Sequence, residues 1–114
     1  MPKVGPFITD PGAGAYCRVT LDGGEKILVS HDKGGFKGGL LVIEVSKLMG
    51  FSSDRIFACN LDSPGGQAVL AWLTRGAEPG SLAATPLGAA VEFVKDAGSL
   101  AELKARCAAL MASR

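Results

Sequence analysis

The segment YCRVTLDGGEKILVSH, residues 16–31, limits the possible folds more than any other part of the chain. Apolar residues occupy alternate positions in each of its halves: Cys17, Val19 and Leu21, then Ile27 and Val29. An alternation of period two is typical of a β-strand with one buried face. Between the halves lies DGGE, whose glycines supply the positive φ that a tight hairpin turn requires. The segment therefore predicts an antiparallel β-hairpin.

Two further apolar segments predict strands in the N-terminal half. In LLVIEVSKLMGF, residues 40–51, two periods compete, because Leu41, Val45 and Leu48 have helical spacing while the β-branched run at residues 42–45 favours a strand. We expect a strand that continues to residue 46 and is followed by a short helical turn, with a helix as the alternative. The segment RIFACNL, residues 55–61, is short, apolar and bounded by polar turn residues, which predicts another strand.

The second half of the chain has the pattern of helices. Ser63 and Pro64 form a suitable N-cap and first-turn pair, and an apolar stripe follows, which we expect Gly76 to end. The next segment, GAEPGSLAAT at residues 76–85, is rich in small residues and predicts a linker. The apolar stripe of the helix that begins at Pro64 consists of Val69, Leu70 and Leu73.

Two more helices are predicted after the linker. Thr85 and Pro86 start the first of them and Gly98 ends it, while Ser99 and Glu102 form a capping box for the second. Because few residues separate these helices, we expect them to fold back as an antiparallel pair. Apolar residues recur at helical spacing on both: Leu87, Val91 and Val94 on the first, and Leu100, Leu103, Cys107, Leu110 and Met111 on the second.

A chain of 114 residues has the length of one domain with one core. The apolar stripes of the helices must cover something, and the small N-terminal sheet is the available surface. We therefore predict a single α+β domain. Residues 1–62 form a small, mainly antiparallel sheet or partial barrel, and it packs against the helices of residues 63–114.

Charge and cysteine content exclude several classes of function. The chain has 12 basic and 11 acidic residues, divided as 7 and 6 over residues 1–60 and 5 and 5 over residues 61–114. This balance is unlike the clustered positive charge of a nucleic-acid-binding protein. The apolar runs are too short to cross a membrane, and no secretory signal is recognisable, so we expect a cytoplasmic protein. The three cysteines are widely spaced, which predicts buried free thiols rather than disulfides or a zinc site.

A glycine-rich loop, HDKGGFKGG at residues 31–39, is the candidate ligand-binding segment. Consecutive glycines allow backbone N–H groups to converge on an anion, and lysines supply the opposite charge. The loop lacks the spacing of a P-loop or a dinucleotide-binding motif, so a loop with solvated lysines is the alternative. The candidate ligand-binding residues are Lys33, Gly34, Gly35, Phe36, Lys37 and Gly38.

Catalytic candidates are few. His31 is the only histidine, and the neighbouring Asp32 could orient it as a general base, with Cys59 or Ser63 as a nucleophile on a nearby strand end. A lone histidine at a strand end is more often a surface or structural residue. The carboxylates are scattered over turns, where they favour local hydrogen bonds, so we expect neither a metal ion nor a cofactor.

The segment Ser63-Pro64-Gly65-Gly66 resembles the strand-to-helix passage of the Clp protease family, which supplies oxyanion-hole amides. That family also carries a nucleophilic serine about 30 positions later and a histidine after it. Here the corresponding region holds only Ser99, and no histidine follows. We therefore interpret the segment as a helix start.

Taken together, these patterns predict a small non-catalytic binding or interaction module that self-associates, with a homodimer as the simplest form. Its partner is an unknown protein or a small anionic ligand, with no role for nucleic acid or membrane. The alternative is a small enzyme or phosphate-binding domain that uses the loop at residues 31–39.

Overall fold

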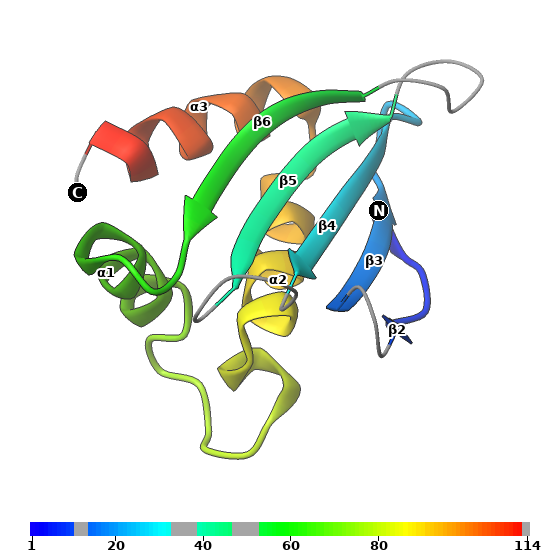
Figure 1. The fold of residues 1–114 in the computed structure, drawn as a ribbon. Coiled ribbons are helices and arrows are strands. Elements are labelled where there is room, and N and C mark those ends of the chain that lie inside the picture. The colour runs from blue at the N-terminus through cyan, green and yellow to red at the C-terminus, as the bar shows by residue number, and fades with distance from the viewer. Residues whose placement is uncertain (11–13, 33–38, 47–52, 113–114) are drawn as a thin grey trace.

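The computed structural model describes residues 1–10, 14–32, 39–46 and 53–112. They form an open six-stranded antiparallel sheet, and the helices of the second half of the chain cover one of its faces (Figure 1). The predicted α+β class is therefore confirmed. The molecule is compact, with a radius of gyration of 13.3 Å. Within the described ranges, no helix has both the length and the apolar character needed to cross a membrane.

The sheet has the strand order β1-β3-β4-β5-β6, and β2 also pairs with β3. The predicted hairpin is confirmed, because β3 and β4 pair antiparallel from Ala15 opposite His31 to Thr20 opposite Lys26. In its turn Gly24 has a φ of 87°, which is the left-handed conformation that favours glycine. The strands are β1 (Lys3–Val4), β2 (Ile8–Asp10), β3 (Gly14–Thr20), β4 (Lys26–Asp32), β5 (Leu40–Ser46) and β6 (Ser53–Asn60).

The strand predicted to continue to residue 46 is confirmed as β5, while the helical turn expected after it lies outside the described residues. The other predicted strand is confirmed as β6, which begins at Ser53, two residues earlier than expected. The register between β5 and β6 shifts at Ile43 and Glu44, which lie opposite Phe57 and Arg55. Ile56 is therefore the extra residue of a β-bulge.

The short strands β1 and β2 were not predicted. They have two and three residues, and prolines at positions 2, 6 and 11 interrupt the segment. No period can be recognised over so few residues. These strands form because β3 offers them an edge, as Val4 pairs with Val19 and Ile8 pairs with Tyr16.

The helices begin where the caps predict. The Ser63 hydroxyl accepts a hydrogen bond from Gly66 N at 2.9 Å, and Ser99 Oγ accepts one from Glu102 N at 3.2 Å. The first helix ends at Leu73, before Gly76, because the backbone and hydroxyl of Thr74 cap it. The helices are α1 (Pro64–Leu73), α2 (Pro86–Ala97) and α3 (Leu100–Ala112), and a short 3-10 helix, η2 (Leu82–Ala84), precedes α2.

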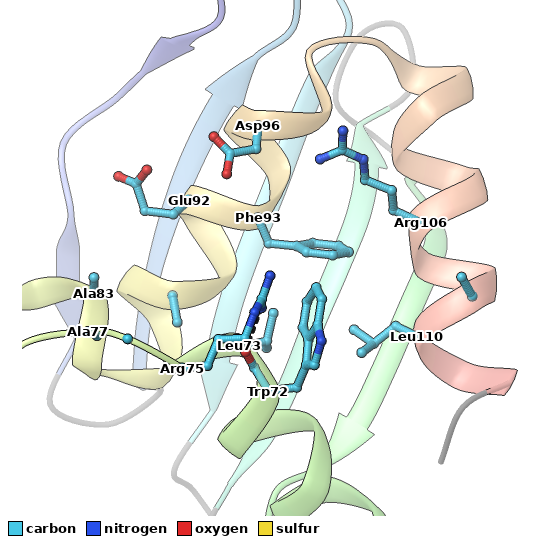
Figure 2. A pocket seen from close by; sticks show the side chains of 13 residues that line it. Trp72, Leu73, Arg75, Ala77, Ala83, Glu92, Phe93, Asp96, Arg106 and Leu110 are labelled. Carbon is cyan, nitrogen blue, oxygen red and sulfur yellow. Dashed lines mark hydrogen bonds between the residues drawn. The ribbon is translucent and has the colours of Figure 1, made fainter.

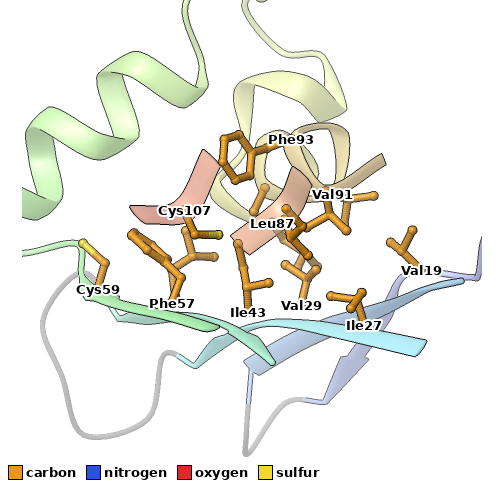
Figure 3. Packing of buried hydrophobic residues seen from close by; sticks show 14 of the residues in the cluster. Val19, Ile27, Val29, Ile43, Phe57, Cys59, Leu87, Val91, Phe93 and Cys107 are labelled. Atoms are coloured by element: carbon orange, nitrogen blue, oxygen red, sulfur yellow. The ribbon is translucent and has the colours of Figure 1, made fainter. Parts of the chain in front are cut away.

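A single core lies between the sheet and the helices. Figure 3 shows strand side chains such as Val29, Ile43 and Phe57 pointing from one face of the sheet toward the helices. Along the chain, α2 contacts β3 and β4, while α1 and α3 contact β6. Most of the predicted helical stripe is buried, but Met111 is 43% exposed, so its assignment to the stripe was wrong. The other face of the sheet carries no described helix (Figure 1).

Candidate functional site

A groove of about 810 Å³ lies between the three α-helices, on the side of the molecule away from the sheet. The end of α1 forms its floor, and α2 and α3 form two walls (Figure 2). Figure 2 shows α2 and α3 on opposite sides of the groove. A volume of this size is in the range of ligand and peptide sites.

Small side chains explain why the groove is open. Ala77 and Ala83 lie in the connection between α1 and α2, Ala89 is on α2 and Ala109 is on α3. Each places a single methyl group where a larger side chain would fill the space between the helices. The groove is thus a consequence of alanine at four separate positions that tertiary structure brings together.

Two aromatic rings form the apolar floor. Trp72, in the last turn of α1, meets Phe93 of α2 edge to face, with ring centroids 5.9 Å apart and an interplanar angle of 81°. This geometry is favourable for aromatic pairs. Phe93 is buried, but Trp72 is 43% exposed, and Leu110 of α3 lies beside it (Figure 2). An exposed tryptophan over a cavity is a typical anchor for a partner.

Arg75 holds Trp72 in this position. Its guanidinium lies 3.7 Å from the centroid of the indole ring, and its Nη1 donates a hydrogen bond of 2.7 Å to the Trp72 carbonyl. The two residues are three positions apart, a spacing that brings side chains together at a helix end. The stack orders both side chains, which reduces the entropy that binding would cost.

Charges of opposite sign lie on different walls of the groove. Glu92 and Asp96, four residues apart, belong to α2, while Arg106 belongs to α3. The Arg106 Nε donates a 3.0 Å hydrogen bond to Glu102, and Figure 2 shows its guanidinium extended toward α2. In the part of the chain that the structure describes, the Asp96 carboxylate has no ion pair, and Glu92 has only a 3.9 Å contact with Lys95.

The three catalytic candidates do not converge. His31 is buried on the helix side of β4, and Asp32, the next residue in the strand, has its side chain on the other face. Cys59 is also buried, but Leu41 lies between it and His31 in the sheet register. Two strand spacings, about 10 Å, separate the backbones of His31 and Cys59.

His31 instead packs against Gly39. A Cβ atom at Gly39 would lie 2.6 Å from His31 Nε2, and Gly39 has a φ of 81°, so this position requires glycine. Ser63, the other suggested nucleophile, caps α1. The predicted ligand-binding residues Lys33, Gly34, Gly35, Phe36, Lys37 and Gly38 lie outside the described residues, and the phosphate hypothesis stays a prediction.

A second surface lies on the side of the sheet away from the helices. We call it the open face, and its outward side chains on β3, β4, β5 and β6 include Tyr16, Arg18, Leu28, Ser30, Glu44, Arg55 and Ala58, together with Val42, which is only 5% exposed. It contains a hollow of about 390 Å³ over β3 and β4. Gly14, Ala15 and Ser30 at this hollow are small, which leaves it open.

Comparison with protein-family models, with curated protein sequences and with solved structures finds no match to this chain. Among the described residues, no group of three or more His, Cys, Asp or Glu side chains is placed to hold a metal ion. Sequence reasoning did not find the groove. Two spacings in the sequence point to it: Trp72 with Arg75, and Glu92 with Asp96.

Proposed function

We propose that this chain is a small, non-catalytic, cytoplasmic interaction module that binds a peptide segment of another protein in the groove between its helices. The observation that carries the proposal is Trp72, half-exposed over an open groove and held in place by Arg75. Tryptophan and arginine are enriched among residues that contribute most to binding energy. A large apolar side chain of the partner would occupy the space beside Trp72 and Phe93.

The charges of the groove support a peptide over a simple anion. Its walls carry two arginines and two carboxylates, so a purely anionic ligand would meet Glu92 and Asp96. A peptide with an apolar anchor and flanking charges of both signs complements all four groups. The distance between His31 and Cys59 supports a non-catalytic role, and the three buried, free cysteines are compatible with a reducing compartment.

Trp72 is the only tryptophan in the chain, so its fluorescence reports directly on the groove. Peptides of twelve random residues would be selected on the immobilised protein and then titrated while Trp72 emission is recorded. We expect selected peptides to carry a large apolar residue with both acidic and basic neighbours, and to shift the emission of Trp72 on binding.

Two matched variants test the location. Ala109→Leu narrows the groove, while Ala108→Leu adds the same atoms at an adjacent exposed position of α3 that does not line it. We expect Ala109→Leu to weaken peptide binding by about tenfold or more, and Ala108→Leu to leave it within about twofold. Selected peptides that bind without changing Trp72 emission, or that bind Ala109→Leu as well as the native protein, would exclude the groove.

We also propose that the chain forms a homodimer. The open face of the sheet supports this, because a small sheet that is covered on one side gains stability by covering the other with a second copy. The bulge at Ile56 in the edge strand β6 disfavours the alternative of edge-to-edge pairing.

A further inference from the structure

The open face carries Lys26 and Asp32 at the two ends of β4, and Arg18 and Glu44 in one row across the sheet. Arg18 on β3 lies opposite Leu28 on β4, and Leu28 lies opposite Glu44 on β5. Arg18 and Glu44 therefore flank Leu28 at equal distances of about 5 Å, one strand spacing on each side. Within the described parts of the chain, neither side chain belongs to an ion pair.

The adjacent row on the same face is apolar at its two sides. Tyr16 on β3 lies opposite Ser30 on β4, and Ser30 lies opposite Val42 on β5. The Arg18 guanidinium lies over the Tyr16 ring, 5.4 Å from its centroid. The face thus carries a basic and an aromatic side chain over β3 and an acidic side chain over β5, with Arg55 of β6 opposite Glu44 in the register.

We propose that two copies of the chain pack through their open faces around a twofold axis that runs along β4. This inference rests on the homodimer proposed above and names its surface. Such an axis exchanges β3 and β5, so Arg18 of each copy meets Glu44 of the partner subunit. Leu28 of each copy lies on the axis and meets its own equivalent. Packed sheets align within about 30°, which keeps these pairs in register near the axis.

Other axes give poorer contacts. An axis along β3 places Arg18 against its own equivalent, and an axis along β5 does the same for Glu44, so both create like-charge contacts in the interface. An axis across the strands, between the two rows, places Glu44 over the position of Val42 of the partner subunit, so Arg18 and Glu44 of the two copies do not meet. Along β4 the like charges that meet, Lys26 and Asp32, are at the two ends of the strand, where solvent screens them.

The hollow on the open face fits the same arrangement. It lies over β3 and β4 and is lined by Tyr16, Arg18 and Leu28 among others, so the β5 side of the second copy faces it. Glu44 is a long side chain of β5 on that side, and Ser53 Oγ donates a 2.8 Å hydrogen bond to its Oε2. Ser53 thereby orders the carboxylate that enters the hollow of the partner and meets Arg18.

Charge exchange tests this interface. Native protein at 100 µM, analysed by sedimentation equilibrium and native mass spectrometry, is expected at twice its monomer mass of 11.7 kDa. Arg18→Glu places two carboxylates together at both ends of the row, and Glu44→Arg places two guanidinium groups together. We expect the dimer dissociation constant of each variant alone to be about tenfold or more above that of the native protein. Circular dichroism confirms that both remain folded.

Mixing the two variants gives the decisive result. A chain with Arg18→Glu and a chain with Glu44→Arg form opposite-charge pairs at both positions, so the equimolar mixture is expected to form a heterodimer of native stability. Lys104→Glu, an equal charge change at an exposed position on α3, is the control and is expected to remain a dimer. A native protein that is monomeric at 100 µM would overturn self-association, while the peptide-binding proposal would stand. A native dimer that Arg18→Glu leaves intact, or variants that fail to combine, would overturn this surface alone.

Discussion

At both Ser63 and Thr85, a hydroxyl caps a helix and a glycine three residues later packs against the preceding backbone. The Ser63 hydroxyl donates to Asn60 O at 2.7 Å and accepts from Gly66 N, and a Cβ at Gly66 would lie 1.9 Å from the same Asn60 oxygen. Gly88 has the same relation to Leu82 O. The tight turn before each helix therefore requires glycine at the third helical position.

Gly66→Ala is expected to destabilise the protein by about 2 kcal/mol or more, because the new methyl group meets a backbone carbonyl that cannot move independently of β6. Gly80→Ala is the control. Gly80 has a φ of 82° but nothing within 4 Å of the added Cβ, so only backbone strain of about 1 kcal/mol is expected. Urea unfolding of both variants measures the difference. Equal losses would show that the contact with Asn60 relaxes without cost.

At the scale of elements, local sequence patterns were sufficient to predict a strand or helix where the pattern extended over the whole element. The alternation in residues 16–31 and the caps at Ser63 and Thr85 located β3, β4, α1 and α2 because each is decided by neighbours in sequence. The strands β1 and β2 could not be found, since they depend on the edge of β3. The groove could not be found either, because its alanines come from separate elements and only packing brings them together.

The cap of α2 is expected to influence the stability of the whole domain, because α2 contacts both β3 and β4. Thr85 Oγ1 accepts from Gly88 N at 3.1 Å and donates to Leu82 O at 2.6 Å. Thr85→Ala removes both hydrogen bonds, and we expect it to lower the free energy of unfolding by about 1 kcal/mol. Thr85→Ser retains the hydroxyl and is expected to have native stability in the same urea titration. A similar loss in both variants would assign the effect to the methyl group of Thr85 instead.

At the scale of the whole molecule, burial of the Cys107 thiol in the core lowers the stability of the protein in alkaline solution. Burial raises the pKa of the Cys107 thiol from its ordinary value of 9.0 to about 11. Burial also raises the pKa of Cys17, although a backbone hydrogen bond of Gly5 opposes the effect. Between pH 9 and about pH 11, the Cys107 thiol of the unfolded chain loses its proton, while the thiol of the folded protein retains it. Stability is therefore unaffected by this thiol below about pH 9 and decreases as the pH rises toward 11, by up to about 1.4 kcal/mol per pH unit.

Cys107→Ala tests this coupling between the core and pH. Urea unfolding at intervals from pH 8 to pH 11 is expected to show a smaller decrease in stability for Cys107→Ala than for the native protein, because the thiol that ionises on unfolding is absent. Val91→Ala, which removes core packing but no thiol, is expected to be less stable at every pH and to keep the native slope. Equal slopes in the native protein and Cys107→Ala would mean that the Cys107 thiol ionises as readily in the folded protein as in the unfolded chain. The core between α3 and the sheet would then admit water in the native state.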